Sequence, residues 1–135
     1  MVKEVSPNSR IVGNCARAFV SGGFICVVGQ GLSDWFMRMG AAKDDAGTYT
    51  AVTLIFFGAL LTGLGIYDKI GKFAGAGTFV PITGFANAVA APAIEFKREG
   101  HVLGIGAKMF VVAGPVIVFG VLTSVVVGIF YYFMK

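Results

Sequence analysis

The feature that most constrains the fold of this chain is one uncharged stretch at residues 73–94, FAGAGTFVPITGFANAVAAPAI. Its 22 residues are enough to cross a bilayer, which takes roughly 20 apolar residues. Proline removes a backbone donor and glycine weakens a helix, so a single regular helix is disfavoured. Irregular backbone at membrane depth is tolerated only where it is buried in protein or lines a wet cavity. The stretch therefore predicts part of a permeation path or of its gate. The residues that interrupt it are Gly75, Gly77, Pro81, Gly84 and Pro92.

The composition indicates an integral membrane protein. Of 135 residues, 56% are hydrophobic and 13% charged, and the mean hydropathy is +0.82. Soluble domains carry about 25% charged residues. The net charge of +4 suits an anionic lipid surface. The 11 lysines and arginines are scattered between apolar runs, so we expect no binding to nucleic acid.

Three further apolar runs predict membrane-spanning helices, at about residues 15–32, 48–67 and 109–134. We therefore expect one all-α membrane domain over residues 1–135, with three or four transmembrane helices. Residues 73–94 either cross fully or form a re-entrant hairpin that turns near Val80–Gly84. The hairpin places eight basic residues on the N-terminal side and three on the other, whereas full crossing gives six and five. The positive-inside rule favours the hairpin, with a cytoplasmic N-terminus.

Small residues recur every four positions on two of the predicted helices. Such stripes let membrane helices approach closely, so we expect helix packing there, within one chain or between subunits. The residues are Ala59 and Gly63 on one helix, and Gly120, Ser124 and Gly128 on the other.

The sequence offers no basis for catalysis or for a cofactor. Hydrolase, metalloprotease and nucleotide-loop motifs are absent. His101 is the one histidine, and a metal site needs three or four ligands, so we expect no metal. Cys15 and Cys26 would lie about 16 Å apart along one helix, too far to form a disulfide with each other.

Polar residues within the interrupted stretch are the candidates for contact with a solute. Thr83 and Asn87 are four residues apart and share a face if this part is helical. Polar side chains in a membrane either bond between helices or face water, and both interpretations remain open. The candidate path or gate comprises Gly75, Gly77, Thr78, Pro81, Thr83, Gly84 and Asn87. Before it we expect a polar bend formed by Asp68, Lys69 and Lys72.

Three segments carry a resemblance to a known family: GGFICVVGQGL (Gly22–Leu32), ALLTGLGIYDKIGKFAGAGTFVPITGFANAVA (Ala59–Ala90) and EFKREG (Glu95–Gly100). They resemble the SpoVAC family of stage V sporulation membrane proteins, whose close relative is the shorter SpoVAE/SpoVAEb family. The resemblance extends over about Asn14–Gly128. The block IYDKIGKFAGAG…VPITGF is its most distinctive part.

The resemblance implies a role that composition does not. Members belong to the apparatus of the spore inner membrane that moves dipicolinic acid, mostly as its calcium chelate, into the forespore and out at germination. Implied partners are other SpoVA proteins, among them SpoVAD and SpoVAE/SpoVAEb, in a homo- or hetero-oligomer. Two alternatives remain open: a tension-gated channel of low solute selectivity, and a structural subunit of the SpoVA complex.

Overall fold

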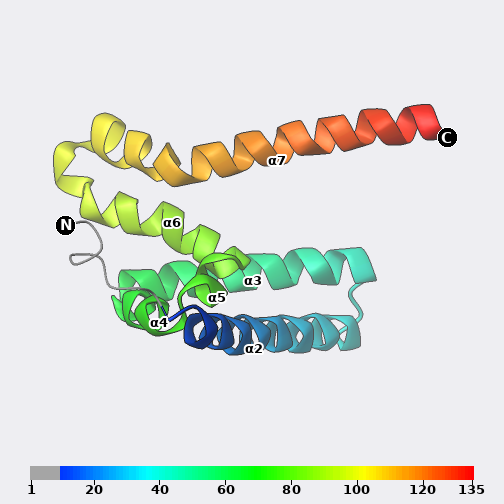
Figure 1. Cartoon of the computed structure of the whole chain (residues 1–135), viewed down its shortest axis with the longest axis horizontal. Coiled ribbons are helices and arrows are strands. Elements are labelled where there is room, and N and C mark those ends of the chain that lie inside the picture. The colour runs from blue at the N-terminus through cyan, green and yellow to red at the C-terminus, as the bar shows by residue number, and fades with distance from the viewer. Residues whose placement is uncertain (1–9) are drawn as a thin grey trace. The chain divides into compact units, whose positions relative to one another are not determined.

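The computed structural model describes residues 10–135, which form helices and short connections, confirming the all-α prediction. Three helical stretches are long and apolar enough to cross a membrane: α2, α3 and the stretch His101–Met134. The elements in chain order are α2 (Ile11–Arg38), α3 (Lys43–Gly63), α4 (Ile66–Ala74), α5 (Ala76–Phe79), α6 (Ile82–Glu95), the 3-10 helix η1 (Lys97–Glu99), the π-helix η2 (His101–Gly106) and α7 (Ala107–Met134) (Figure 1).

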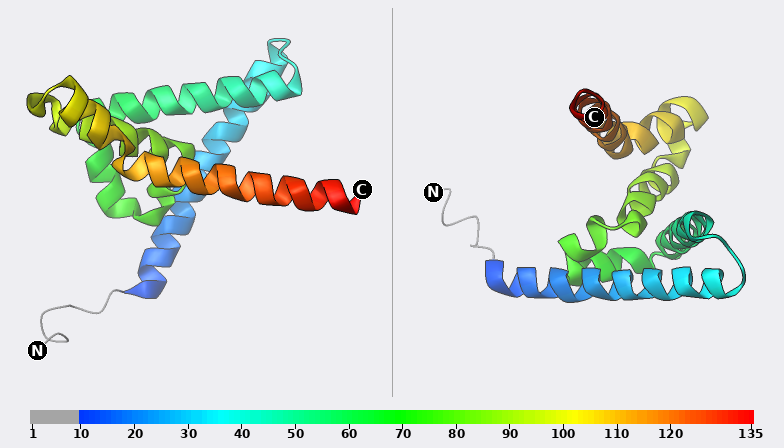
Figure 2. Two further views of the ribbon diagram at one scale, coloured as in Figure 1. Left: turned by 90° about the horizontal axis from the view of Figure 1, so that it is seen from above. Right: turned by 90° about the vertical axis from the view of Figure 1, so that its right-hand side faces the viewer.

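The chain divides into two compact units, one ending at Asn87 and the other running from Ala88 to Lys135. In the first unit, α2 and α3 meet beside the connection at residues 39–42 and diverge away from it (Figure 2, left). Helices α4 and α5 contact α2, and α4 also contacts α3. Helices α4 and α5, which contain the start of the interrupted segment (residues 73–94), therefore pack against these two diverging helices.

The predicted helix at 48–67 is interrupted before its end. Helix α3 stops at Gly63, and Gly65 adopts the left-handed conformation with φ of +69°. Glycine reaches that region without steric cost, so the chain changes direction there and a separate helix, α4, begins. The expected connection at Asp68–Lys72 is consequently helical and lies inside α4.

The interrupted stretch breaks at two places in the structure. Gly75 has φ of +57° and ψ of −131°, a conformation that favours glycine, and it separates α4 from α5. The second break is at Val80–Pro81, between the end of α5 and the start of α6. The predicted turn at Val80–Gly84 overlaps this second break.

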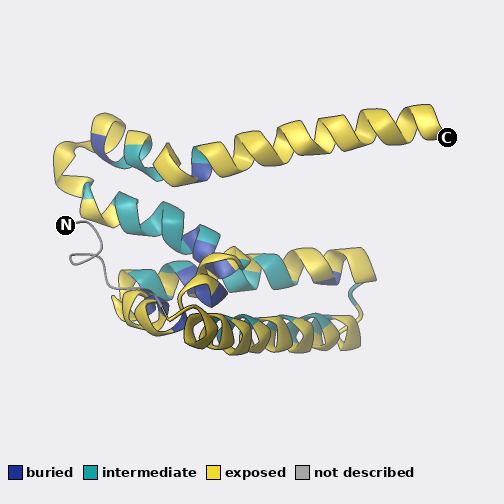
Figure 3. Cartoon of the chain, in the orientation of Figure 1, coloured by how far each residue is buried: buried dark blue, intermediate teal, exposed yellow. Residues whose placement is uncertain are grey.

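The second unit contains the end of α6, then η1, η2 and α7. Residues 95–108, which lie between the interrupted stretch and the predicted helix at 109–134, are largely helical, because η1 and η2 occupy them and η2 leads directly into α7. Lys108 Nζ lies 4.6 Å from the centre of the Phe96 ring, a cation–π contact within this unit. Helix α7 continues through Pro115 and is exposed along almost all of its length (Figure 3).

Small residues form most of the core. The buried hydrophobic residues of the described chain are Ala46, Tyr67, Ala74, Ala86 and Ala113. No large side chain there is fully buried, while leucines, valines and phenylalanines remain exposed. Membrane helices pack in this way, since lipid solvates large apolar side chains and small residues permit close backbone approach.

Gly77 makes the closest approach between α5 and α2. A Cβ atom built on Gly77 would collide with the Ser21 hydroxyl and with the backbone of Ala18. A Cβ on Gly22 would in turn lie 3.4 Å from the Gly77 carbonyl oxygen. The two helices therefore meet backbone to backbone at Ala18 and Gly77, with only the small Ser21 side chain beside the contact.

We predict that Gly77→Ala destabilises the protein by about 1–3 kcal/mol, because the added methyl overpacks this contact. Thermal unfolding of the purified protein in detergent measures the effect. Gly23→Ala is the matched control, since nothing lies within 4 Å of a Cβ there. Equal melting temperatures for the two variants would contradict the proposed contact.

Candidate functional site

A hydrogen-bonded cluster of polar groups joins Tyr67 of α4 to the interrupted segment. Tyr67 is 4% exposed, and its hydroxyl donates to the Thr78 carbonyl oxygen at 2.7 Å. Tyr67 Oη also lies 3.2 Å from Thr83 Oγ1. A phenol has one proton, so the second bond can form with the Thr83 hydroxyl as donor. The cluster links α4, α5 and α6 in the interior of the first unit.

A second polar contact joins α3 to α6. The Thr62 hydroxyl lies 2.8 Å from Asn87 Oδ1 and 2.7 Å from the Gly58 carbonyl oxygen, so two acceptors are within reach of its proton. A Cβ on Gly58 would lie 3.0 Å from the Thr83 carbonyl oxygen. Gly58 thus allows α6 to come close enough for the bond between Thr62 and Asn87.

The predicted path residues share one region but differ in surroundings. Gly77, Thr78, Thr83 and Gly84 are buried, Pro81 and Asn87 are half-buried, and Gly75 is exposed. The Thr78 hydroxyl donates to the Gly75 carbonyl oxygen at 3.1 Å. Across residues 10–135, every buried side-chain oxygen or nitrogen has a hydrogen-bond partner. The buried polar side-chain groups of the segment therefore all have hydrogen-bond partners within the protein in this conformation.

The α4 helix presents three different faces. Tyr67, Gly71 and Ala74 are buried, at the spacing of one helix face. The second face is apolar and exposed, and consists of Ile66, Ile70 and Phe73. The third is polar, and consists of the predicted bend residues Asp68, Lys69 and Lys72. One face of α4 packs against protein, the second is apolar and exposed, and the third is polar. A short helix with these three faces is suited to the membrane–water boundary.

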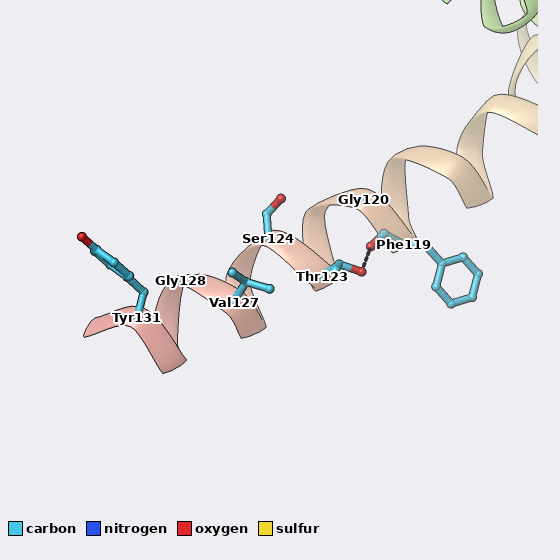
Figure 4. A pocket seen from close by; sticks show the side chains of 7 residues that line it. All are labelled: Phe119, Gly120, Thr123, Ser124, Val127, Gly128 and Tyr131. Carbon is cyan, nitrogen blue, oxygen red and sulfur yellow. Dashed lines mark hydrogen bonds between the residues drawn. The ribbon is translucent and has the colours of Figure 1, made fainter. Parts of the chain in front are cut away.

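The two predicted small-residue stripes have different environments. On α3, the contact with α6 is at Gly58 and Thr62, while Ala59 is half-buried and Gly63 exposed. On α7, the predicted residues lie along a shallow groove with exposed walls (Figure 4). The groove is lined by Phe119, Gly120, Thr123, Ser124, Val127, Gly128 and Tyr131.

Tyr67 and Thr62 are not among the site residues predicted from the sequence. The hydrophobic pattern places Tyr67 at the end of the predicted helix at 48–67, whereas in the structure it shares a face of α4 with Gly71 and Ala74. A tyrosine aligned with two small residues on a short amphipathic helix was the available signal. Thr62 offered no such signal, since its contact with Asn87 joins residues 25 positions apart.

Groups that could hold a metal are absent from the part of the chain that the structure describes. His101 is exposed at the start of η2. Cys15 and Cys26 are free and exposed on α2.

Comparison with known proteins places the chain in a family. The family model described as SpoVAC/SpoVAEB sporulation membrane protein matches residues 14–130. The chain is 52% identical over 128 residues to a Bacillus subtilis (strain 168) protein named stage V sporulation protein AC, covering 94% of this chain and 85% of that protein. No solved structure matches the chain. These matches confirm the resemblance seen in the sequence.

We predict that Tyr67→Phe destabilises the protein by about 0.5–2 kcal/mol, because the Thr78 carbonyl and the Thr83 hydroxyl lose their shared partner. Tyr131→Phe is the control, since Tyr131 is exposed on α7. Thermal unfolding in detergent compares both variants with the parent protein. A Tyr67→Phe variant as stable as Tyr131→Phe would show that the cluster contributes nothing.

Proposed function

The chain belongs to the SpoVAC/SpoVAEB family of sporulation membrane proteins, and we propose that it is a subunit of a conduit for dipicolinic acid. The solute would cross the spore inner membrane as its calcium chelate, inward during sporulation and outward at germination. The observation that carries the proposal is the buried polar cluster of the interrupted segment, which lies between two spanning helices.

The chemistry of the cluster suits such a solute. Dipicolinate carries two carboxylates, which only accept hydrogen bonds, and hydroxyl groups such as those of Tyr67, Thr78 and Thr83 can donate them. The one-to-one chelate of dipicolinate with calcium has no net charge, so a path for it needs no buried lysine or arginine. In the conformation described, these donors bond within the protein. Passage would exchange those bonds for bonds to the solute.

A conduit requires more than one chain, because three spanning helices enclose little space. We propose that neighbouring subunits complete it, either further copies or other SpoVA proteins such as SpoVAD and SpoVAE/SpoVAEb. The α7 groove, with Gly120, Ser124 and Gly128, supports close approach of another helix.

A second candidate is a valve that opens under membrane tension with little solute selectivity. The observation that favours this valve is helix α4, whose faces suit the membrane–water boundary. A helix at that boundary would move when the membrane is stretched laterally. One glycine, Gly75, joins α4 to α5, which contacts α2 through Gly77. Displacement of α4 would therefore act directly on the interrupted segment.

Liposomes that contain the full chain, alone or with SpoVA partners, distinguish these functions. Release of calcium dipicolinate is compared with that of a neutral solute of similar size, under isotonic and hypo-osmotic conditions. Selective dipicolinate release supports the conduit. Release of both solutes only under stretch supports the valve. No release under any condition contradicts both and points to a structural subunit.

We predict that Thr83→Val slows dipicolinate release by roughly three- to tenfold, because it removes a hydroxyl worth about 0.5–1.5 kcal/mol at nearly constant volume. Thr53→Val is the matched control, as the Thr53 hydroxyl bonds only to the Tyr49 carbonyl of its own helix, at 2.7 Å, and lies outside both the cluster and the α7 groove. Equal release rates for the two variants would count against a role for the cluster in passage.

A further inference from the structure

A pocket of about 370 Å³ lies where the first half of α2 meets the junction of α4 and α5. It belongs entirely to the first unit and is separate from the polar cluster described above. Two of its lining residues are cationic, Arg17 from α2 and Lys72 from α4. The remaining lining residues are Asn14, Cys15, Ala18, Phe73, Ala74, Gly75 and Ala76.

The Arg17 guanidinium is available for an anion. It lies 5.4 Å from the centre of the Phe73 ring, a cation–π contact that holds it at the pocket. Within residues 10–135 no carboxylate forms an ion pair with it. Its planar arrangement of N–H donors matches the oxygens of a phosphate.

Lys72 already forms one ion pair, with Asp68. Its ammonium group donates to Asp68 Oδ2 at 2.7 Å, and the two side chains are 76% and 70% exposed. An ion pair so exposed is strongly screened by water, and an ammonium group has three donors. Lys72 therefore retains donors for a second anion, although Asp68 competes with that anion for its charge.

The pocket lies at the border between the apolar and the polar face of α4. Phe73, which is 67% exposed, continues the apolar face formed with Ile66 and Ile70, while Lys72 belongs to the polar face. A soluble anion would contact only the charged groups of Arg17 and Lys72. A phospholipid would contact both faces of α4, with its phosphate at these two cations and an acyl chain along the apolar face.

We propose that Arg17 and Lys72 bind the phosphate group of an anionic phospholipid at the membrane surface. The bound lipid holds α4 at the membrane–water boundary and fixes the depth of the first half of α2 in the membrane. The site does not depend on dipicolinate transport, so binding and release are tested separately.

Native mass spectrometry of the full chain, released from nanodiscs of mixed phosphatidylglycerol and phosphatidylcholine, measures the proposed binding. We expect retained phosphatidylglycerol, and about fivefold weaker retention for Arg17→Gln or Lys72→Gln, since each charge near a lipid surface contributes about that factor. Lys72→Arg should preserve binding. Asp68→Asn should strengthen it, because Lys72 loses its competing carboxylate.

Arg38→Gln is the matched control, as Arg38 ends the same helix outside the pocket. Equal loss in Arg38→Gln would overturn the proposal by showing attraction to net charge alone. Equal retention of both lipids would also overturn it. Displacement of the lipid by millimolar inorganic phosphate or dipicolinate would assign the pocket to a soluble anion instead. Thermal unfolding of each variant verifies that it is folded.

Discussion

The backbone contact between Gly77 and α2 is the constraint on which the arrangement of the first unit depends. Because Gly77 has no side chain and the facing residues are small, α5 lies directly against Ala18, Ser21 and Gly22. Because α4 is packed against α5 and α2, the same contact also positions the end of α4. Tyr67 of α4 is then buried beside the start of α6. In a membrane, where lipid solvates large apolar side chains as well as protein does, such close packing is the main available source of specificity.

The polar cluster stabilises the closed conformation through hydrogen bonds that can also be exchanged for others. Its hydroxyls are buried, and a buried hydroxyl without a partner is costly, so the bonds of Tyr67 to Thr78 and Thr83 hold three helices together. Each bond is nevertheless modest in net energy, since the alternative partners of a hydroxyl are also favourable. A segment held in this way is stable when closed, and its bonds can be replaced one at a time by bonds to a solute. This property links the packing of the interrupted segment to the proposed passage of dipicolinate.

Helix α4 connects the interior of the first unit with the proposed lipid-binding pocket. Its buried face carries Tyr67, and its polar face carries Lys72, which lines the pocket with Arg17. The proposed lipid binding at the pocket and the hydrogen bonding in the cluster would therefore act on opposite sides of one nine-residue helix. Gly65 and Gly75 bound this helix, both with positive φ, so each of its junctions, to α3 and to α5, is at a conformation that glycine adopts without steric cost.

The sequence by itself determined the membrane class, the central parts of the long helices, the family and the second break near Pro81, because these depend on local composition, hydrophobic run length and proline. It predicted that Thr83 and Asn87 share a face, but not what they contact. Only the tertiary structure decided that the chain also breaks at Gly65, that the expected polar bend is a helix, and that Tyr67 and Thr62 are the partners of the segment's polar groups. A glycine inside an apolar run is compatible with either a continuous helix or a break, and neighbouring helices decide between them. Hydrogen-bond partners 16 and 25 residues apart are likewise brought together by packing, which no local pattern encodes.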